Sequence, residues 1–199
     1  IINNSDNLLL KNSKILDNAL LRENFQRDFL HSKIKNFDDN DFIIISDVDE
    51  IPNLEKFKYK SKITFFEQKM FYYKFNLLNK TNPYWYGSRI CKKKFLKNPQ
   101  WLRDQKIKIY PFWRFDKIKW NIIKNGGWHF SFLMNIDQIK LKLNSYAHAE
   151  YNNSRFNSYE KINLAIKNKV DLFNRDISFN VIPFDESFPN YIFKNKEKF

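Results

Sequence analysis

The segment Asp41–Asn53, "DFIIISDVDEIPN", decides the fold class. Its first part, Phe42–Ser46, is an apolar and β-branched run of the kind that forms a strand entering a core. Acidic residues follow the run at once: Asp47, Asp49 and Glu50. In α/β proteins, ligands bind at the carboxyl ends of such strands. The segment therefore predicts an α/β fold with a polar site directly after this strand.

The length and composition are those of one packed domain. The chain has 199 residues, of which 43% are hydrophobic and 18% are aromatic, and this is enough to bury a core. We predict a single domain over residues 1–199, with a polar and poorly ordered segment at 1–13. Residues 182–199 contain two prolines and are expected to form a strap across the surface. Only three glycines are present, which excludes a glycine-rich phosphate loop.

The formal net charge is +13, and its lysines are scattered along the whole chain. Such a chain either carries a solvated basic surface or attracts an anionic partner such as phospholipid or a sugar nucleotide. No helix-turn-helix, zinc-finger or RNP pattern is present, so no nucleic-acid partner is predicted. No apolar run reaches the roughly 18 residues of a membrane-spanning helix. The single cysteine, Cys91, excludes an internal disulfide and fits a reducing compartment.

Periodicity predicts the main helices. An amphipathic helix is expected over Asp17–Phe37, where Leu21, Phe25 and Phe29 recur at four-residue spacing. Two later helices are expected to begin with capping boxes, formed by Asn135 with Gln138 and by Asn157 with Glu160. Between the first helix and these two, residues 63–78 are rich in aromatic residues and are expected to form strands.

The acidic pair predicts a metal site. Residues two apart in an extended backbone point the same way, so Asp47 and Asp49 are expected to share one target. Two such carboxylates repel each other, and a divalent cation with a preference for hard oxygen ligands, Mg²⁺ or Mn²⁺, removes that repulsion. We expect Asp49 to bind the metal directly, and Asp47 to bind the metal or the ribose of a nucleotide. The alternative to a metal site is a turn that ends the strand and carries two solvated acids.

Three chemistries use acids at the end of a strand. An EF-hand loop needs further acids and a glycine at fixed spacing, and "DVDEIPNLEKF" lacks both. A haloacid-dehalogenase-type phosphatase also carries Asp-x-Asp, but Glu50 and Ile51 stand where it usually has glycine and threonine or valine. The third is a sugar-nucleotide transferase, in which the acids hold a metal on the diphosphate. The glutamate and proline that follow the acidic pair, Glu50 and Pro52, are compatible with that chemistry.

Several stretches in order resemble glycosyltransferase family 17, the family of the bisecting β-1,4-mannosyl-glycoprotein N-acetylglucosaminyltransferase. Besides "IIISDVDEIPN", these stretches are "RENFQRDFL" at 22–30, "YYKFNLLN" at 72–79, "WYGSRI" at 85–90, "GGWHFSFL" at 126–133, "KLNSYAHAEYN" at 142–152 and "FPNYIFKNKEKF" at 188–199. The resemblance spans about residues 15–199. It implies a metal-dependent inverting transferase with a GT-A-like, Rossmann-like core, a mixed sheet flanked by helices, a UDP-sugar donor carrying N-acetylglucosamine, and a glycan or glycoconjugate acceptor.

The front of the chain departs from that family pattern. In a GT-A fold, strands that hold the uracil and ribose precede the Asp-x-Asp strand, whereas only a helix is expected before Phe42 here. We therefore expect the domain to be truncated at its N-terminus. The alternative from another class is a catalytically silent remnant that binds carbohydrate or membrane.

Further side chains are candidates for the site. His129 follows the paired glycines in "NGGWHFS" and is the expected third metal ligand, with His148 as its rival. On the polar side of the first helix, residues that can contact a nucleotide are Arg22, Gln26 and Arg27. The inverting base is sought among Glu50, Glu150, Asp104 and Asp116. An aromatic platform for the acceptor could come from Trp85, Tyr86, Trp101 and Trp113, which are otherwise core residues.

The expected location depends on the source of the chain. A bacterial or viral enzyme of this kind would be cytoplasmic, with its basic surface suited to peripheral contact with the inner membrane. A eukaryotic full-length enzyme would lie in the Golgi lumen.

Overall fold

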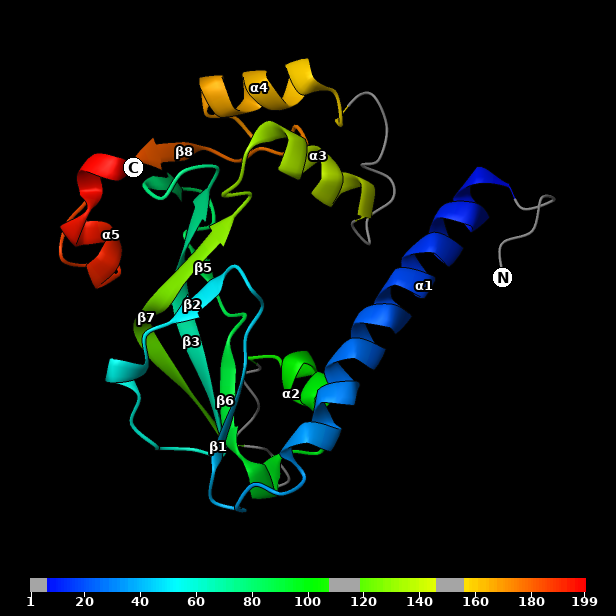
Figure 1. The fold of residues 1–199 in the computed structure, drawn as a ribbon, viewed down its shortest axis with the longest axis vertical. Helices are drawn as coiled ribbons and strands as arrows, with labels where there is room; N and C mark the ends of the chain where they lie inside the picture. Colours follow the sequence, from blue (N-terminus) through cyan, green and yellow to red (C-terminus); the bar gives the residue numbers. More distant parts are fainter. Residues whose placement is uncertain (1–6, 108–118, 146–155) are drawn as a thin grey trace, which may run out of the picture. The chain divides into compact units, whose positions relative to one another are not determined.

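The computed structural model describes residues 7–107, 119–145 and 156–199 (Figure 1). It is a mixed α/β structure with one eight-stranded sheet. The α-helices are α1 (Leu8–Phe29), α2 (Pro99–Asp104), α3 (Ile136–Ser145), α4 (Tyr159–Asn168) and α5 (Asn190–Lys194). The 3-10 helices are η1 (Leu30–Ile34), η2 (Leu54–Lys56), η3 (Lys93–Phe95) and η5 (Lys196–Lys198). The strands are β1 (Phe42–Ile45), β2 (Glu50–Pro52), β3 (Ile63–Tyr72), β4 (Leu77–Asn79), β5 (Tyr84–Trp85), β6 (Arg89–Lys92), β7 (Trp120–Ser131) and β8 (Phe179–Val181).

The sheet runs in the order β1-β6-β3-β4-β8. Strands β5 and β7 also pair with β3, and β2 pairs with β7. Strand β1 lies at the end of this order and pairs antiparallel with β6, so that Phe42 faces Lys92 across the pair. The predicted strand therefore exists, but Ile43 is its only buried residue. A strand with one neighbour in the sheet is covered less than a central strand, which explains why β1 is not the core strand that its apolar sequence suggested.

The core strand is β3. Phe65, Phe66 and Phe71 are each exposed by 1% or less, and the strand pairs with β5 and β6 in antiparallel register. Aromatic and β-branched side chains fit a strand that is covered by neighbours on both sides. The expectation of strands within 63–78 is confirmed, because β3 and β4 both lie in that range.

The chain divides into two compact units. We call Arg27–Phe71 with Pro83–Phe130 the site unit, and Ile1–Gln26, Tyr72–Asn82 and Ser131–Phe199 the helical unit. The site unit contains β1, β2, β5, β6 and α2, with most of β3 and β7. The helical unit contains β4, β8, α3, α4 and α5, with most of α1 (Figure 1).

Helices α3 and α4 form where predicted. Asn135 and Gln138 cap α3 reciprocally, because each backbone N–H donates to the other side chain, at 3.1 and 2.9 Å. The cap of α4 differs by one residue from the prediction. Ser158, not Asn157, accepts the hydrogen bond from the Lys161 N–H, and the Asn157 side-chain amide donates to Asn144.

Helix α1 differs from its prediction in both bounds. It begins at Leu8, where Asn7 accepts a hydrogen bond from the Leu10 N–H at 2.9 Å. It ends at Phe29, and the chain continues as η1. The predicted apolar stripe is exposed rather than buried, at 64% for Leu21, 74% for Phe25 and 57% for Phe29. Within the site unit, Arg27 and Asp28 at the end of this helix make polar contacts with Gln100 of α2.

Strands β2 and β7 approach each other closely at Gly127. Gly127 has φ of 143°, and a Cβ atom there would meet the Ile51 carbonyl oxygen at 2.2 Å. The glycine is required because the two backbones approach so closely, and the Asn53 N–H donates to the Gly126 carbonyl at 2.7 Å. The paired glycines thus allow the close approach of the neighbouring strand. None of the helices in the described ranges has the length and apolar character that crossing a bilayer requires.

Candidate functional site

The acids lie in a tight turn between β1 and β2, within the site unit. The Glu50 N–H donates to the Asp47 carbonyl at 3.0 Å, which closes the turn, and the Val48 side chain at its tip is fully exposed. The backbone from Asp47 to Asp49 is therefore not extended as predicted. Because a turn does not keep the two-residue alternation of a strand, the two aspartates have different neighbours.

Glu50 is the buried centre of the site. Its Oε1 accepts hydrogen bonds from Trp85 Nε1 at 2.6 Å and Arg103 Nη2 at 3.0 Å. Its Oε2 accepts from Arg103 Nη1 at 3.2 Å, Ser88 Oγ at 3.1 Å and the Asp47 N–H at 3.1 Å. Burial by itself would raise the pKa of Glu50, but Arg103, Trp85 and the Asp47 N–H together hold that pKa below its ordinary value. Glu50 is therefore a stable anion.

The chain approaches Glu50 closely at one glycine. A Cβ atom on Gly87 would lie 1.7 Å from Glu50 Oε1, so any larger residue there would displace the carboxylate. The Gly87 carbonyl also accepts hydrogen bonds from Arg103 at 2.6 Å and from Arg89 at 3.1 Å. The "WYGSR" stretch thus shapes one wall of the site.

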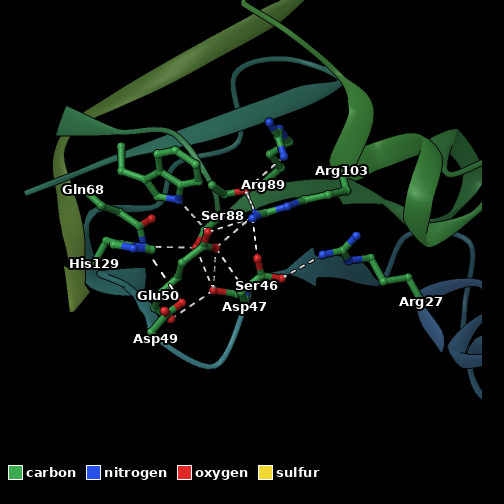
Figure 2. A network of polar contacts seen from close by, with 12 residues as sticks. Arg27, Ser46, Asp47, Asp49, Glu50, Gln68, Ser88, Arg89, Arg103 and His129 are labelled. Atoms are coloured by element: carbon green, nitrogen blue, oxygen red, sulfur yellow. Dashed lines mark hydrogen bonds and ion pairs between the residues drawn. The ribbon is translucent and has the colours of Figure 1, made fainter. Parts of the chain in front are cut away.

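Asp47 lies between two arginines. Its Oδ2 is 2.5 Å from Arg103 Nη2, and its Oδ1 is 3.4 Å from Arg27 Nη2. Figure 2 shows both guanidinium groups directed toward this carboxylate, one from α1 and one from α2. The Asp47 side chain is 38% exposed, whereas that of Glu50 is fully buried. Asp47 is therefore the accessible acid of the cluster.

Asp49 faces β7. Its Oδ1 is 4.0 Å from His129 Nδ1, and the His129 side chain is 9% exposed. The antiparallel pairing of β2 with β7 places His129 directly opposite Glu50, and the Phe130 N–H donates to the Asp49 carbonyl at 2.8 Å. The imidazole ring also lies 5.2 Å from the Trp85 ring. The sequence-predicted neighbours Asp49 and His129 are thus brought together by strand pairing.

The donor set fits a divalent cation only in part. In the described ranges, no group of three or more His, Cys, Asp or Glu side chains could hold a metal ion. Asp49 and His129 are close enough to share an ion, and Asp47 is the nearest further carboxylate along the turn. Mg²⁺ at nucleotide sites is held by one or two carboxylates together with substrate phosphates and water. The residues therefore fit a cation that arrives with a phosphate ligand.

A sequence profile of glycosyltransferase family 17 matches residues 6–197, nearly the whole chain. The chain belongs to glycosyltransferase family 17. No curated protein and no solved structure matches it. The family resemblance carried by "IIISDVDEIPN" and the later stretches is thereby confirmed, and the family description indicates glycosyltransferase activity.

The remaining predicted residues of this family 17 chain are distributed unevenly. Arg27 lies in the site, whereas Arg22 and Gln26 are exposed on α1, and among the described residues their side chains have no hydrogen bond to the site. Asp104 accepts a hydrogen bond from Gln100 at 2.8 Å on α2. The predicted residues that lie outside the described ranges are Trp113, Asp116, His148 and Glu150.

The expected aromatic platform is not assembled from its three described members. Trp101 and Tyr86 pack against the core cluster that contains Phe65 and Leu102, and the Tyr86 hydroxyl donates to buried Glu67 at 2.8 Å. Trp85 is 38% exposed and uses its indole N–H for Glu50. Of the three, Trp85 alone is part of the site.

Sequence reasoning missed several residues of this family 17 site. They are Ser46, Trp85 in its hydrogen-bonding role, Ser88, Arg89 and Arg103. Four of them lie inside or beside stretches that resemble the family, so those stretches could have indicated them. Arg103 lies 53 positions after Glu50, in a helix without any such motif, and only the tertiary structure shows its role.

Proposed function

We propose that this family 17 chain transfers a sugar from a UDP-sugar to a glycan acceptor, with inversion and with a divalent cation. The resemblance to the bisecting enzyme favours N-acetylglucosamine as the transferred sugar. The proposal includes a GT-A-like arrangement for the core. Its main support is the cluster of Asp47, Glu50 and two arginines at the end of β1, within a chain that the family profile matches.

The charges of the cluster suit a diphosphate. A UDP-sugar brings phosphate oxygens that need compensation by cations, and arginine matches their geometry with paired N–H donors. Asp49 and His129, with Asp47 beside them, would hold Mn²⁺ or Mg²⁺ when the donor binds. The cation would act as a Lewis acid and stabilise the negative charge of the leaving diphosphate. His129 must be neutral to bind it.

The roles of the two glutamate candidates separate on chemical grounds. A base must accept a proton, but both oxygens of Glu50 already accept hydrogen bonds from side-chain or backbone donors. The lowered pKa of Glu50, held down by Arg103 against the effect of burial, also makes it a weak base. We therefore assign Glu50 to positioning Arg103 and the turn, and the candidate bases that remain are Glu150, Asp104 and Asp116.

An acceptor-dependent release of UDP tests the proposal. Protein is incubated with UDP-N-acetylglucosamine and a panel of N-glycans in Mn²⁺ and in EDTA, and UDP is measured. We expect release only with both acceptor and Mn²⁺. Because a Lewis acid supplies several kcal/mol, and about 1.4 kcal/mol corresponds to tenfold in rate, Asp49→Asn should lower kcat/KM about hundredfold or more.

A matched control is Asp137→Asn, which removes an exposed aspartate from α3 and should leave UDP release unchanged. NMR of the product gives the anomeric configuration. Hydrolysis of a phosphomonoester that Asp49→Asn abolishes would replace the proposal by a phosphatase. Absence of both activities across a panel of sugar nucleotides would favour a silent binding remnant.

A further inference from the structure

Two guanidinium groups contact the acids of the turn after β1, and a third donates to the Gly87 carbonyl beside them. Arg27 comes from the last turn of α1, Arg89 from β6 and Arg103 from α2 (Figure 2). The acids there are Asp47, Asp49 and Glu50, so the six formal charges cancel. Without a cation, carboxylates alone would repel a diphosphate. The arginines remove that repulsion.

The acids are not equivalent as partners of the arginines. The Glu50 side chain is fully buried and accepts hydrogen bonds from Trp85, Ser88, Arg103 and the Asp47 N–H. Asp47 is 38% exposed and receives one guanidinium group on each oxygen. A carboxylate held between two guanidinium groups occupies the place that arginines also offer to a phosphate. Because Asp47 is accessible, it can be replaced there by a stronger anion.

Arg89 adds positive charge behind this pair. Burial and the neighbouring charge of Arg103 lower the pKa of Arg89 to about 10, so it stays protonated at neutral pH. Its buried Nε has no hydrogen-bond partner among the described residues. The cluster therefore retains one unused N–H donor beside the two arginines that hold Asp47.

We propose that Arg27 and Arg103 form the diphosphate-binding site, and that Asp47 occupies it in the ligand-free protein and leaves when the anion binds. The identity of the anion as a donor diphosphate rests on the proposed function. The site itself should also take inorganic pyrophosphate. Displacement frees Asp47 for a divalent cation, so anion and cation should each strengthen the binding of the other.

The test is the sign of the effect of Asp47→Asn. If Asp47 competes with the anion, the amide should bind pyrophosphate more tightly in EDTA, by about threefold or more for a half-exposed ion pair. In Mn²⁺ the same variant should bind UDP more weakly, because a metal ligand is lost. A carboxylate with a structural role alone would give no gain in EDTA.

Isothermal titration with pyrophosphate and with UDP, in EDTA and in Mn²⁺, measures both effects. Arg27→Gln should weaken pyrophosphate binding about tenfold or more, as expected for a charged hydrogen bond. Arg27→Lys should lose less pyrophosphate affinity than Arg27→Gln, because lysine keeps the positive charge but lacks the paired N–H donors of the guanidinium group. Arg27 makes no hydrogen bond to Glu50, so its variants avoid leaving that buried acid unpaired. The charge-matched control, Lys167→Gln on exposed α4 surface, should bind like wild type.

The inference is overturned if wild type binds no pyrophosphate in either buffer, if Arg27→Gln binds as wild type does, or if Asp47→Asn weakens binding in EDTA. Arginine-dependent binding without any sugar transfer would keep the anion site and remove the proposed function. Sugar transfer whose KM for the donor is unaffected by Arg27→Gln would keep the function and remove the anion site.

Discussion

Each of the two units contains a buried carboxylate paired with arginine, and the two pairs are built differently. In the helical unit, Asp171 is 4% exposed. Its Oδ2 accepts from the N–H groups of Phe173 at 2.9 Å and Arg175 at 3.0 Å, and from Arg175 Nε at 3.1 Å. Its Oδ1 accepts from Arg175 Nη2 at 2.6 Å. All donors lie within four residues of the acid, so a local turn satisfies this carboxylate completely.

In the site unit, Glu50 and Arg103 are 53 residues apart. Four segments meet there: the turn after β1, the β5–β6 region, the end of α1 and α2. The cluster also includes a second, accessible acid and two further arginines. The comparison teaches that a buried acid–arginine pair does not by itself indicate a site. What distinguishes the Glu50 cluster is a partly exposed carboxylate, Asp47, that is held by arginines from distant segments.

The largest expected effect is the loss of Arg103. Arg103→Met leaves Glu50 buried and charged without its guanidinium partner, which should lower the free energy of unfolding by about 3–5 kcal/mol. Urea unfolding followed by tryptophan fluorescence measures it, because Trp85, Trp101 and Trp120 belong to the site unit. The double variant Glu50→Gln/Arg103→Met should lose less stability than the single variant, because it leaves no buried charge without a partner. A loss below about 1 kcal/mol in the single variant would show that Arg103 does not hold Glu50.

The next effect concerns the local pair. Asp171→Asn removes the acceptor of charged hydrogen bonds and should lower the free energy of unfolding by about 1.5–3 kcal/mol. Binding of UDP should stay within twofold of wild type, because this pair has no part in the proposed site. Urea unfolding followed by circular dichroism, with titration of UDP, checks both. Asp176→Asn, an exposed aspartate in the same loop, is the control. A tenfold loss of UDP affinity in folded Asp171→Asn would show that the Asp171–Arg175 pair does contribute to the UDP site.

The smallest effect is a difference in pH dependence. The folded pKa of Glu50 lies below its ordinary value of 4.5, because Arg103 and the other donors outweigh burial. Its stabilisation is therefore present above the unfolded pKa and is lost as the pH falls through 4.5 toward the folded pKa, by about 1.4 kcal/mol for each unit of lowering.

Melting temperatures between about pH 6 and about pH 3 measure this loss. Glu50→Gln should be less stable than wild type at neutral pH and should lose less on acidification. Glu186→Gln removes an exposed glutamate and should keep the wild-type slope. Parallel curves for wild type and Glu50→Gln would show that this carboxylate is not specially stabilised as an anion.

The sequence by itself determined the features that depend on neighbouring residues. Apolar periodicity predicted α3, α4 and the β1 strand, and the spacing of Asn135 and Gln138 predicted a capping box that the structure forms. The ordered family stretches, from "IIISDVDEIPN" onward, predicted the family. Such features are encoded within one or two helical turns, or within one strand, and can be read without knowing what packs against them.

Only the tertiary structure decided which side chains meet. The sequence predicted an amphipathic helix with an apolar stripe, yet Phe25 in that stripe is 74% exposed, because burial depends on what packs against a face and not on its pattern. It treated Asp47 and Asp49 as one pair, whereas the turn gives one to arginines and the other to His129. Arg103 had no local signal at all. Its role exists because the packing of α2 brings a guanidinium group to a carboxylate 53 residues earlier in the chain, and contacts of that range are set by the fold as a whole.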